Sequence, residues 1–168
     1  MEELIDKAQK GNKAAFCHLL DIHLQILYKI AWTYLKNEED IADAIQDTIC
    51  SCYEKIGQLR RPEYFRTWLI RILINHCNDI LSKRKQTVPV DMLPETGVQE
   101  KQYSEIEWRH VMKQLTEEYQ TILILYYLEE MSVKEIAALL ELKENTVKSR
   151  LLRGRRQLLQ ILEGKYEN

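Results

Sequence analysis

The chain has 168 residues, of which 45% are hydrophobic and 30% charged, and its formal net charge is −2 at pH 7. This length suits one globular domain or two small ones, and five glycines and three prolines are fewer than a turn-rich all-β fold usually needs. No apolar run approaches the ~18–20 residues of a membrane span, and the charged start MEELIDKAQKGN has no signal-peptide core, so we expect a cytoplasmic, all-α protein.

Three helices are expected in the first half of the chain. Residues 12–35 repeat apolar side chains at spacings of three and four, which predicts a long helix. Asn37 precedes three acidic residues, a pattern typical of an N-cap followed by the anions that the helix dipole favours, so a second helix should run to about Ile56. Pro62 suits a first helical position and opens a third expected helix that ends near Lys83.

A change of composition separates this half from the next. Residues 86–103 hold two of the three prolines and show no sustained period, which indicates a flexible linker between two small helical domains, 1–85 and 104–168. In the second domain Ser132 and Glu135 form a predicted capping box. Helices are expected there at about 104–114, 117–130, 132–141 and 144–163.

Positive charge is concentrated in two segments of this mildly acidic chain. Residues 60–85 hold seven cations and two anions, and residues 143–157 hold six cations and one anion. Each segment alone could be a solvated helix face. Two such segments, each following an acidic block, favour two contacts with one polyanion.

The second basic segment forms the last expected helix. Its inward side would consist of Val147, Leu151, Gly154, Leu158 and Ile161 or Leu162. Its outward side would carry Asn145, Ser149, Arg153 and Arg156, which suit phosphates and base edges. The helix before it supplies small and apolar residues at the spacing of a helix-turn-helix, whose second helix enters the DNA major groove. Two residues depart from the usual turn: Glu141 replaces a common Gly, and Lys143 a common Ser or Asp cap.

The first basic segment combines an aromatic ring, a cation and an amide. Trp68, Arg71, Asn75 and Asp79 share one stripe of the third helix, which offers a stacking plane for an unpaired base and contacts for its phosphates. An alternative for Trp68 is a core aromatic. The inward stripe of this helix should be Phe65, Leu69, Ile72, His76 and Ile80.

An acidic face is expected on the second helix, where Asp40, Asp43, Gln46 and Asp47 recur. Metal ligands are one interpretation, but no histidine or further carboxylate on that face completes a set, and no catalytic partner is evident. A solvated acidic face is another. We therefore expect no catalytic residue, no metal and no cofactor.

The four cysteines and three of the tyrosines are expected to have structural rather than chemical roles. The four cysteines show no C-x-x-C spacing, so we expect buried or half-buried thiols. Cys50 and Cys52 should point to different sides of one helix. Tyr28, Tyr126 and Tyr127 lie among Leu and Ile residues at helical spacing and are expected in the core.

Three segments carry a resemblance to a known family. SVKEIAALLELKENTVKSRLLRGRRQL resembles region 4 of bacterial RNA polymerase sigma factors of the sigma-70 family, extracytoplasmic-function (ECF, group IV) type. NEEDIADAIQDTICSCYEKI, with its D-x-x-Q-D core, resembles region 2.2, and RPEYFRTWLIRILINHCNDILSKRK resembles regions 2.3 and 2.4. The resemblance covers nearly the whole chain in the order of the family, and only the linker is unmatched.

The resemblance implies a transcription initiation factor and assigns residues to three contacts. Duplex DNA at the −35 element would be bound by Asn145, Thr146, Lys148, Ser149, Arg150, Leu152, Arg153 and Arg156, with Arg155 on phosphates. The −10 element would be melted and its flipped base captured by Arg60, Arg61, Arg66, Trp68, Arg71 and Asn75, together with the loop 57–61. Core polymerase would be bound by Asp40, Asp43, Gln46 and Asp47.

The partners implied are core RNA polymerase, through its β′ clamp and β flap, promoter DNA, and an anti-sigma factor that is often membrane-anchored. No small-molecule substrate is implied, and the free protein should be a monomer. Two other classes are weighed. A stand-alone regulator predicts an effector pocket in residues 1–85, and a metal-dependent helical enzyme would use the cluster from Asp40 to Asp47 but leaves both basic segments unexplained.

Overall fold

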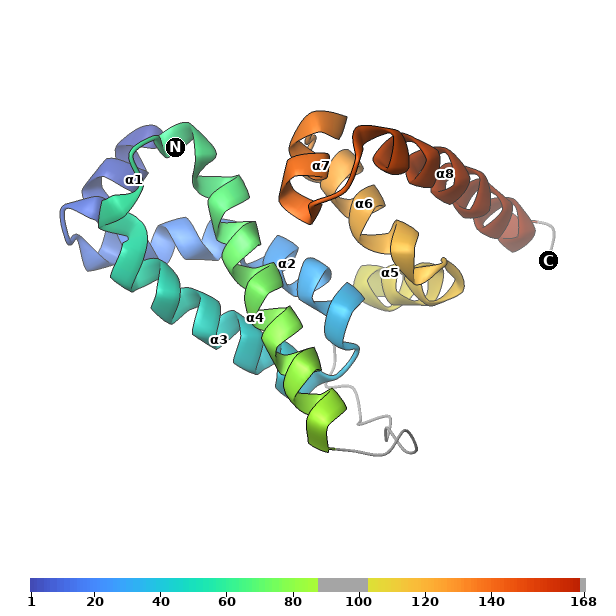
Figure 1. Ribbon diagram of the computed structural model, residues 1–168, viewed down its shortest axis with the longest axis horizontal. Helices are drawn as coiled ribbons and strands as arrows, with labels where there is room; N and C mark the ends of the chain where they lie inside the picture. The colour runs from blue at the N-terminus through green and yellow to red at the C-terminus, as the bar shows by residue number, and fades with distance from the viewer. Residues whose placement is uncertain (88–102, 167–168) are drawn as a thin grey trace. The chain divides into compact units, whose positions relative to one another are not determined.

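The structure, a computed structural model, describes residues 1–87 and 103–166, and within these ranges it contains helices and no strand, as Figure 1 shows. The all-α prediction is confirmed. The chain divides into two compact units, Met1–Thr96 and Gly97–Asn168, called here the N-terminal unit and the C-terminal unit. The predicted flexible linker lies almost entirely outside the described residues, and the predicted domain ends stay a prediction.

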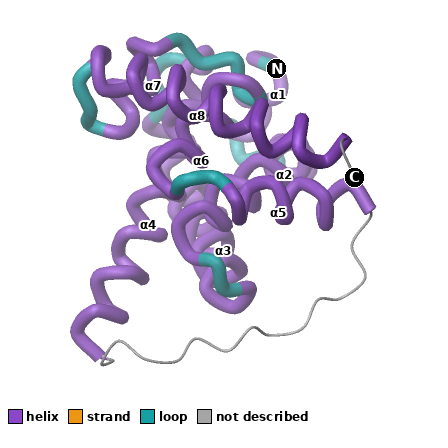
Figure 2. The backbone as a smooth tube through the Cα atoms, turned by 90° about the vertical axis from the view of Figure 1, so that its right-hand side faces the viewer, coloured by secondary structure: helices purple, strands orange, loops and turns teal. Residues whose placement is uncertain are grey.

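Four α-helices and two short 3₁₀ turns make up the described part of the N-terminal unit. They are α1 (Glu2–Gln9), α2 (Lys13–Leu35), α3 (Glu38–Lys55), η1 (Ile56–Gln58), η2 (Pro62–Tyr64) and α4 (Phe65–Thr87). Short loops join them, drawn in teal in Figure 2. The predicted cap of α3 is confirmed, because the Asn37 side chain accepts a hydrogen bond from the backbone N–H of Asp40 at 3.1 Å. The sequence does not predict α1, because a helix of eight residues is too short to show a recognisable apolar period.

The N-terminal core forms where α2, α3 and α4 pack against one another. Leu19, Leu27 and Ile30 of α2 are almost fully buried. The inward stripe predicted for α4 is only partly correct. Phe65 and Leu69 are buried, whereas Ile72, His76 and Ile80 are half-buried. Because α4 packs against both α2 and α3, its buried face is broader than one stripe and includes Ile70, Leu73, Ile74 and Cys77.

The four cysteines divide into two kinds. Cys52 and Cys77 are buried between helices, and desolvation by burial raises the pKa of each thiol to about 12. Cys17 and Cys50 are exposed, so the expectation of buried or half-buried thiols is wrong for these two. Cys50 and Cys52 do lie on different sides of α3, as predicted.

The described part of the C-terminal unit, residues 103–166, contains four helices. They are α5 (Tyr103–Gln114), α6 (Glu117–Tyr127), α7 (Val133–Leu140) and α8 (Glu144–Tyr166). The expectation that Tyr126 and Tyr127 belong to the core is wrong: they are 38% and 47% exposed, with their rings edge-to-face at 5.1 Å. The core side of α6 is formed by residues 122–125, and the two tyrosines follow at the end of the helix.

The turn between α7 and α8 has the predicted helix-turn-helix organisation. The capping box is confirmed, since the Glu135 N–H donates to Ser132 Oγ and the Ser132 N–H donates to Glu135 Oε2. Glu141 adopts the left-handed conformation with φ of 55°, and the backbone N–H groups of Glu141 and Leu142 both donate to the Ala137 carbonyl. α8 then begins with the Lys143 carbonyl accepting from the N–H of Thr146 and of Val147.

Candidate nucleic-acid and polymerase interfaces

One exposed surface of the N-terminal unit is formed by α4 and the segment before it; we call it the capture surface, made of the loop 57–61 with Arg66, Trp68, Arg71 and Asn75. Arg71 and Asn75 are exposed on α4, and Arg60 and Arg61 are exposed between η1 and η2. Trp68 and Arg66 are half-buried, and the Trp68 ring lies 6.0 Å from that of Phe65. Trp68 therefore packs on the core with part of its ring and leaves part accessible.

The loop of the capture surface is held by contacts that sequence analysis missed. Gln9 Nε2 donates to the carbonyls of Ile56 and Leu59 at 2.9 and 2.8 Å. The Arg61 guanidinium lies 5.8 Å from the centre of the Tyr64 ring, within the range of a cation–π contact. No local pattern reveals the role of Gln9, because its partners are 47 and 50 residues away.

The acidic face predicted on α3 is only partly an open surface. Asp43, Gln46 and Asp47 are exposed. Asp40 instead turns toward α4, where its Oδ2 lies 2.6 Å from Arg84 Nη2, and its side chain is only 16% exposed. The structure thus leaves three of the four residues exposed, while the fourth joins α3 to α4.

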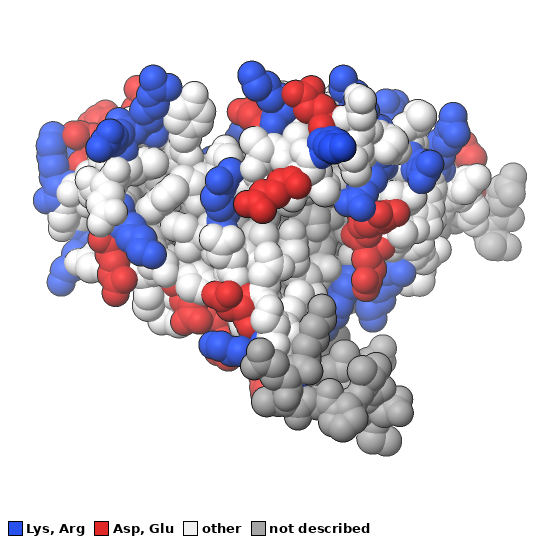
Figure 3. Space-filling view, viewed as in Figure 1, with Lys and Arg blue, Asp and Glu red and all other residues white. Residues whose placement is uncertain are grey.

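On the C-terminal unit, the recognition stripe is formed by the outward residues of α8, namely Asn145, Ser149, Arg153 and Arg156. All four are exposed, and Lys and Arg side chains follow the outer edge of α8 in Figure 3. Lys148 is exposed beside the stripe, and Leu152 is 52% exposed, so an apolar side chain lies among these cations.

Two residues of the predicted −35 contact interact with other residues of the C-terminal unit. Arg150 Nη2 lies 2.8 Å from Glu118 Oε2 of α6, and the arginine side chain is 29% exposed. Thr146 is half-buried, and its carbonyl accepts a hydrogen bond from Ser149 Oγ. The Arg150–Glu118 ion pair fixes one edge of α8 on α6, a role that sequence analysis did not identify.

α8 also approaches α6 closely at a glycine. A Cβ placed on Gly154 would lie 3.0 Å from Tyr119 Cβ and 3.1 Å from Leu123 Cδ1. Nearby, the Gln157 amide accepts from the Thr116 N–H and donates to the Gln114 carbonyl, both at 3.1 Å. These contacts determine how far the recognition stripe stands from the rest of the unit.

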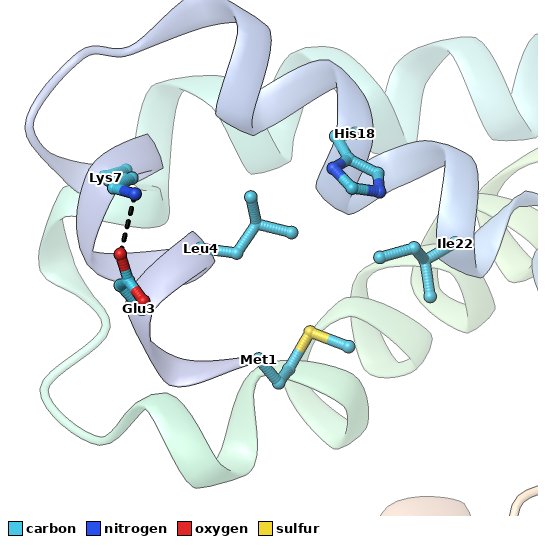
Figure 4. A pocket seen from close by; sticks show the side chains of 6 residues that line it. All are labelled: Met1, Glu3, Leu4, Lys7, His18 and Ile22. Carbon is cyan, nitrogen blue, oxygen red and sulfur yellow. Dashed lines mark hydrogen bonds and ion pairs between the residues drawn. The ribbon is translucent and has the colours of Figure 1, made fainter.

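A hollow of about 330 Å³ opens between α1 and α2 (Figure 4). Its lining combines apolar Met1, Leu4 and Ile22 with His18 and an exposed Lys7–Glu3 ion pair of 2.7 Å. Two of its three polar side chains, Lys7 and Glu3, bond to each other, so we assign no ligand to the hollow.

Within 1–87 and 103–166, no three His, Cys, Asp or Glu side chains are grouped to hold a metal ion. In the same ranges, no helix has the length and apolar character needed to cross a bilayer.

Each of the two units matches a region of one known protein family. Residues 19–87 match the family model of Sigma-70 region 2, and residues 105–158 match that of Sigma-70, region 4. The RNA polymerase sigma factor SigV of Bacillus subtilis is 30% identical over 153 residues, which cover 88% of this chain and 91% of SigV. The chain belongs to the sigma-70 family of RNA polymerase sigma factors. Its type is extracytoplasmic-function, as in SigW of the same species, 28% identical over 94% of each chain.

Solved structures agree with the fold of this sigma factor. CnrH, solved in complex with the cytosolic domain of CnrY, has a TM-score of 0.66 at 24% identity and covers 97% of both chains. RpoE of Bartonella quintana, solved with the anti-sigma factor NepR, has a TM-score of 0.68 at 21% identity, covering 88% of this chain and 96% of that one. The region 2 match of this sigma factor contains the acidic face and the whole capture surface, whereas α1 lies outside both matches.

Proposed function

We propose that this sigma factor binds core RNA polymerase and directs it to promoters through the three surfaces described above. The recognition stripe reads the −35 element as duplex DNA, and the capture surface holds the unpaired −10 strand. Asp43, Gln46 and Asp47 contact the β′ clamp, and the C-terminal unit contacts the β flap. The observation that carries the proposal is the presence in one chain of both region matches, each with an exposed cationic surface.

Each surface has chemistry suited to its proposed task. Arg153 and Asn145 offer the guanidinium and amide groups that bind base edges in the major groove, and Leu152 is placed to touch a thymine methyl. At the −10 element, binding of an extruded base offsets an unstacking cost of a few kcal/mol. The exposed amide of Asn75 is suited to hydrogen-bond such a base, and Arg60, Arg61 and Arg71 are suited to its phosphates.

The acidic balance of the chain fits this division of work. Non-specific DNA affinity comes from cations on phosphates, and a net charge of −2 weakens it. Promoter binding would then become strong only when polymerase holds both units on the same DNA, which raises the effective concentration of each.

Control by an anti-sigma factor is part of the proposal. The solved relative RpoE is complexed with the anti-sigma factor NepR. For this chain, we propose a protein partner, anchored in the membrane, that covers the polymerase-binding or DNA-binding surfaces. The free sigma factor would act as a cytoplasmic monomer without a small-molecule substrate.

The proposal is tested by adding the full chain to sigma-free core polymerase and sequencing transcripts from a pooled promoter library. Start sites that depend on the protein, with shared upstream motifs, are the expected result. Asp43→Ala should weaken polymerase binding, Arg153→Ala should weaken −35 binding about tenfold or more, and Asn75→Ala should impair −10 opening.

Matched controls use exposed residues outside the three surfaces. Asp21→Ala, Gln25→Ala and Lys113→Ala should each leave transcription close to wild type. If nothing initiates while the protein alone binds a defined duplex, the chain is instead a stand-alone regulator.

A further inference from the structure

Gln9 joins α1 to the loop of the capture surface. It is the last residue of α1, and Figure 1 shows this helix beside the segment that leads from α3 to α4. Its side-chain Nε2 donates to the Ile56 carbonyl at 2.9 Å and to the Leu59 carbonyl at 2.8 Å. The orientation of the amide follows from its partners, because two carbonyl oxygens can accept only from the NH₂ group.

The two carbonyls belong to opposite ends of one 3₁₀ turn. Ile56 is the first residue of η1, and Leu59 is its C-cap, whose own N–H donates back to the Ile56 carbonyl at 3.1 Å. Gln9 therefore bonds both ends of the turn and holds it against α1. Because Gln9 is half-buried, water competes for these bonds less than it would on an open surface.

The chain leaves this turn directly into two cations of the capture surface. Arg60 and Arg61 follow Leu59, both are exposed, and Arg61 is the N-cap of η2 with Pro62 next. Proline restricts φ at the far end of this segment, and Gln9 holds the near end. The two arginines thus lie on a short segment whose backbone conformation is restricted at both ends.

α1 is itself held firmly enough to serve as a support. Ile5 and Ala8 are buried, at 1% and 5% exposure. The turn to α2 passes through Gly11 with φ of 86°, and Asn12 caps α2 by accepting from the Ala15 N–H at 3.0 Å. Gln9 therefore projects from a helix that is packed on the unit by one face and joined to α2 by a short, capped turn.

We propose that Gln9 is a positioning residue for −10 capture: it orders the Arg60–Arg61 segment before DNA binds. Preordering lowers the entropy lost when the segment closes on the unpaired strand, so affinity rises without a new DNA contact. This inference rests on the proposed function, and it adds a residue from outside the region 2 match to the −10 interface.

Two substitutions separate the hydrogen bonds from side-chain size. Gln9→Met keeps the length and removes the donors, and Gln9→Glu replaces them with oxygens that face two carbonyls. In holoenzyme, affinity for a single-stranded −10 oligonucleotide should fall several-fold for Gln9→Met and about tenfold for Gln9→Glu, as expected for the loss of two ordinary hydrogen bonds. Core-polymerase affinity and −35 duplex affinity should change less than about twofold, well under the effect of one hydrogen bond.

The control variants are Gln25→Met and Gln25→Glu, which make the same changes at an exposed position of α2 and should match wild type. A double-mutant cycle separates positioning from general stability. In an Arg60→Ala/Arg61→Ala background, Gln9→Met should have almost no further effect on −10 affinity, because the groups it positions are gone. Circular dichroism of each variant verifies that the helices are retained.

The outcomes distinguish this inference from the proposed function. If wild-type holoenzyme neither opens nor binds the −10 strand, the proposed function fails whatever Gln9 does. If wild type opens promoters and the Gln9 variants bind the −10 strand equally well, the inference is overturned. It is also overturned if the loss caused by Gln9→Met is the same with and without the two arginines.

Discussion

The two cationic surfaces are held in place by contacts of different range along the chain. In the N-terminal unit, the segment before α4 is held by Gln9, whose partners lie 47 and 50 residues away. In the C-terminal unit, the turn before α8 is built from neighbours: the Leu142 N–H donates to the Ala137 carbonyl, and the Lys143 carbonyl accepts from the Thr146 N–H. Local turn chemistry therefore shapes the start of α8, while contacts such as that of Gln157 with Thr116, 41 residues apart, hold the rest of α8 on α6. The segment before α4 instead takes its support from a distant helix.

The largest expected effect tests how far the capture surface depends on its core. Phe65 is 1% exposed, and its ring lies 5.4 Å from that of His23. Phe65→Ala should lower the free energy of unfolding of the N-terminal unit by about 3–5 kcal/mol, because a large buried side chain is lost and a cavity remains. Hydrogen exchange should accelerate in α2, α3 and α4.

The control is Leu24→Ala on α2, where the side chain is 44% exposed and little stability should be lost. Exchange in α6, α7 and α8 provides the internal comparison. If Phe65→Ala accelerated exchange equally in those helices, the two units would unfold together, and their surfaces would not differ in what holds them.

A second substitution tests the long-range part of the C-terminal surface. Gly154→Val should destabilise the C-terminal unit by about 1–3 kcal/mol, because its Cβ would lie 3.0 Å from Tyr119 Cβ and force α8 away from α6. Affinity for −35 duplex should fall, while binding to the −10 strand should be retained.

Gly164→Val is the matched control on the same helix, where nothing lies within 4 Å of the added Cβ. Exchange rates in α6 and α8 measure the difference between the two variants. Equal effects of the two valines would show that helix propensity, rather than the close approach to Tyr119, determines the loss.

Alkaline pH should destabilise the N-terminal unit more than the C-terminal unit, because the buried thiols lie in the N-terminal unit only. Burial raises the pKa of Cys52 and of Cys77 to about 12, from an ordinary value near 9.0. The unfolded chain therefore ionises these thiols first. Their contribution to stability is complete below pH about 9 and declines as pH rises toward 12, by up to ~1.4 kcal/mol per pH unit and thiol.

Urea unfolding between pH 8 and 10, followed by exchange in each unit, measures this effect. The N-terminal unit should lose about 2–3 kcal/mol more than the C-terminal unit over that interval, because each of the two thiols contributes ~1.4 kcal/mol for one pH unit of ionisation. A Cys52→Ala/Cys77→Ala variant should lose this excess. Its persistence in that variant would assign the alkaline sensitivity to other groups.

Sequence reasoning predicted best where the physical cause is local. The caps at Asn37 and Ser132 were predicted because an N-cap needs only a side-chain oxygen and an N–H three residues on. The exposed residues of α8, such as Arg153, followed from helical periodicity. These features needed no knowledge of what packs against each helix.

The predictions that are wrong or missing concern residues whose environment is determined by what packs against them. Tyr126 and Tyr127 have helical spacing among apolar residues, but α6 ends there and leaves both exposed. Asp40 resembles its exposed neighbours in sequence, yet Arg84 of α4 turns it inward. Gln9 shows no pattern at all, because its partners are backbone carbonyls about 50 residues away.

The smallest expected effect concerns the local turn and has the opposite sign. Glu141 holds a φ of 55°, where a side chain with a Cβ is disfavoured and glycine is not. Glu141→Gly should therefore stabilise the C-terminal unit by up to about 1 kcal/mol, since the turn keeps both N–H bonds to the Ala137 carbonyl and loses the strain.

The control is Ala138→Gly, an exposed position in the interior of α7, where glycine should cost about 1 kcal/mol because helical backbone is entropically unfavourable for it. Opposite signs at these two positions would show that the backbone conformation of the turn, rather than glycine itself, determines the change. Because the turn precedes α8 directly, a stabilised Glu141→Gly variant should keep its −35 affinity. If the variant lost −35 affinity while gaining stability, the Glu141 carboxylate would itself be orienting α8, and the turn would no longer be explained by backbone chemistry alone.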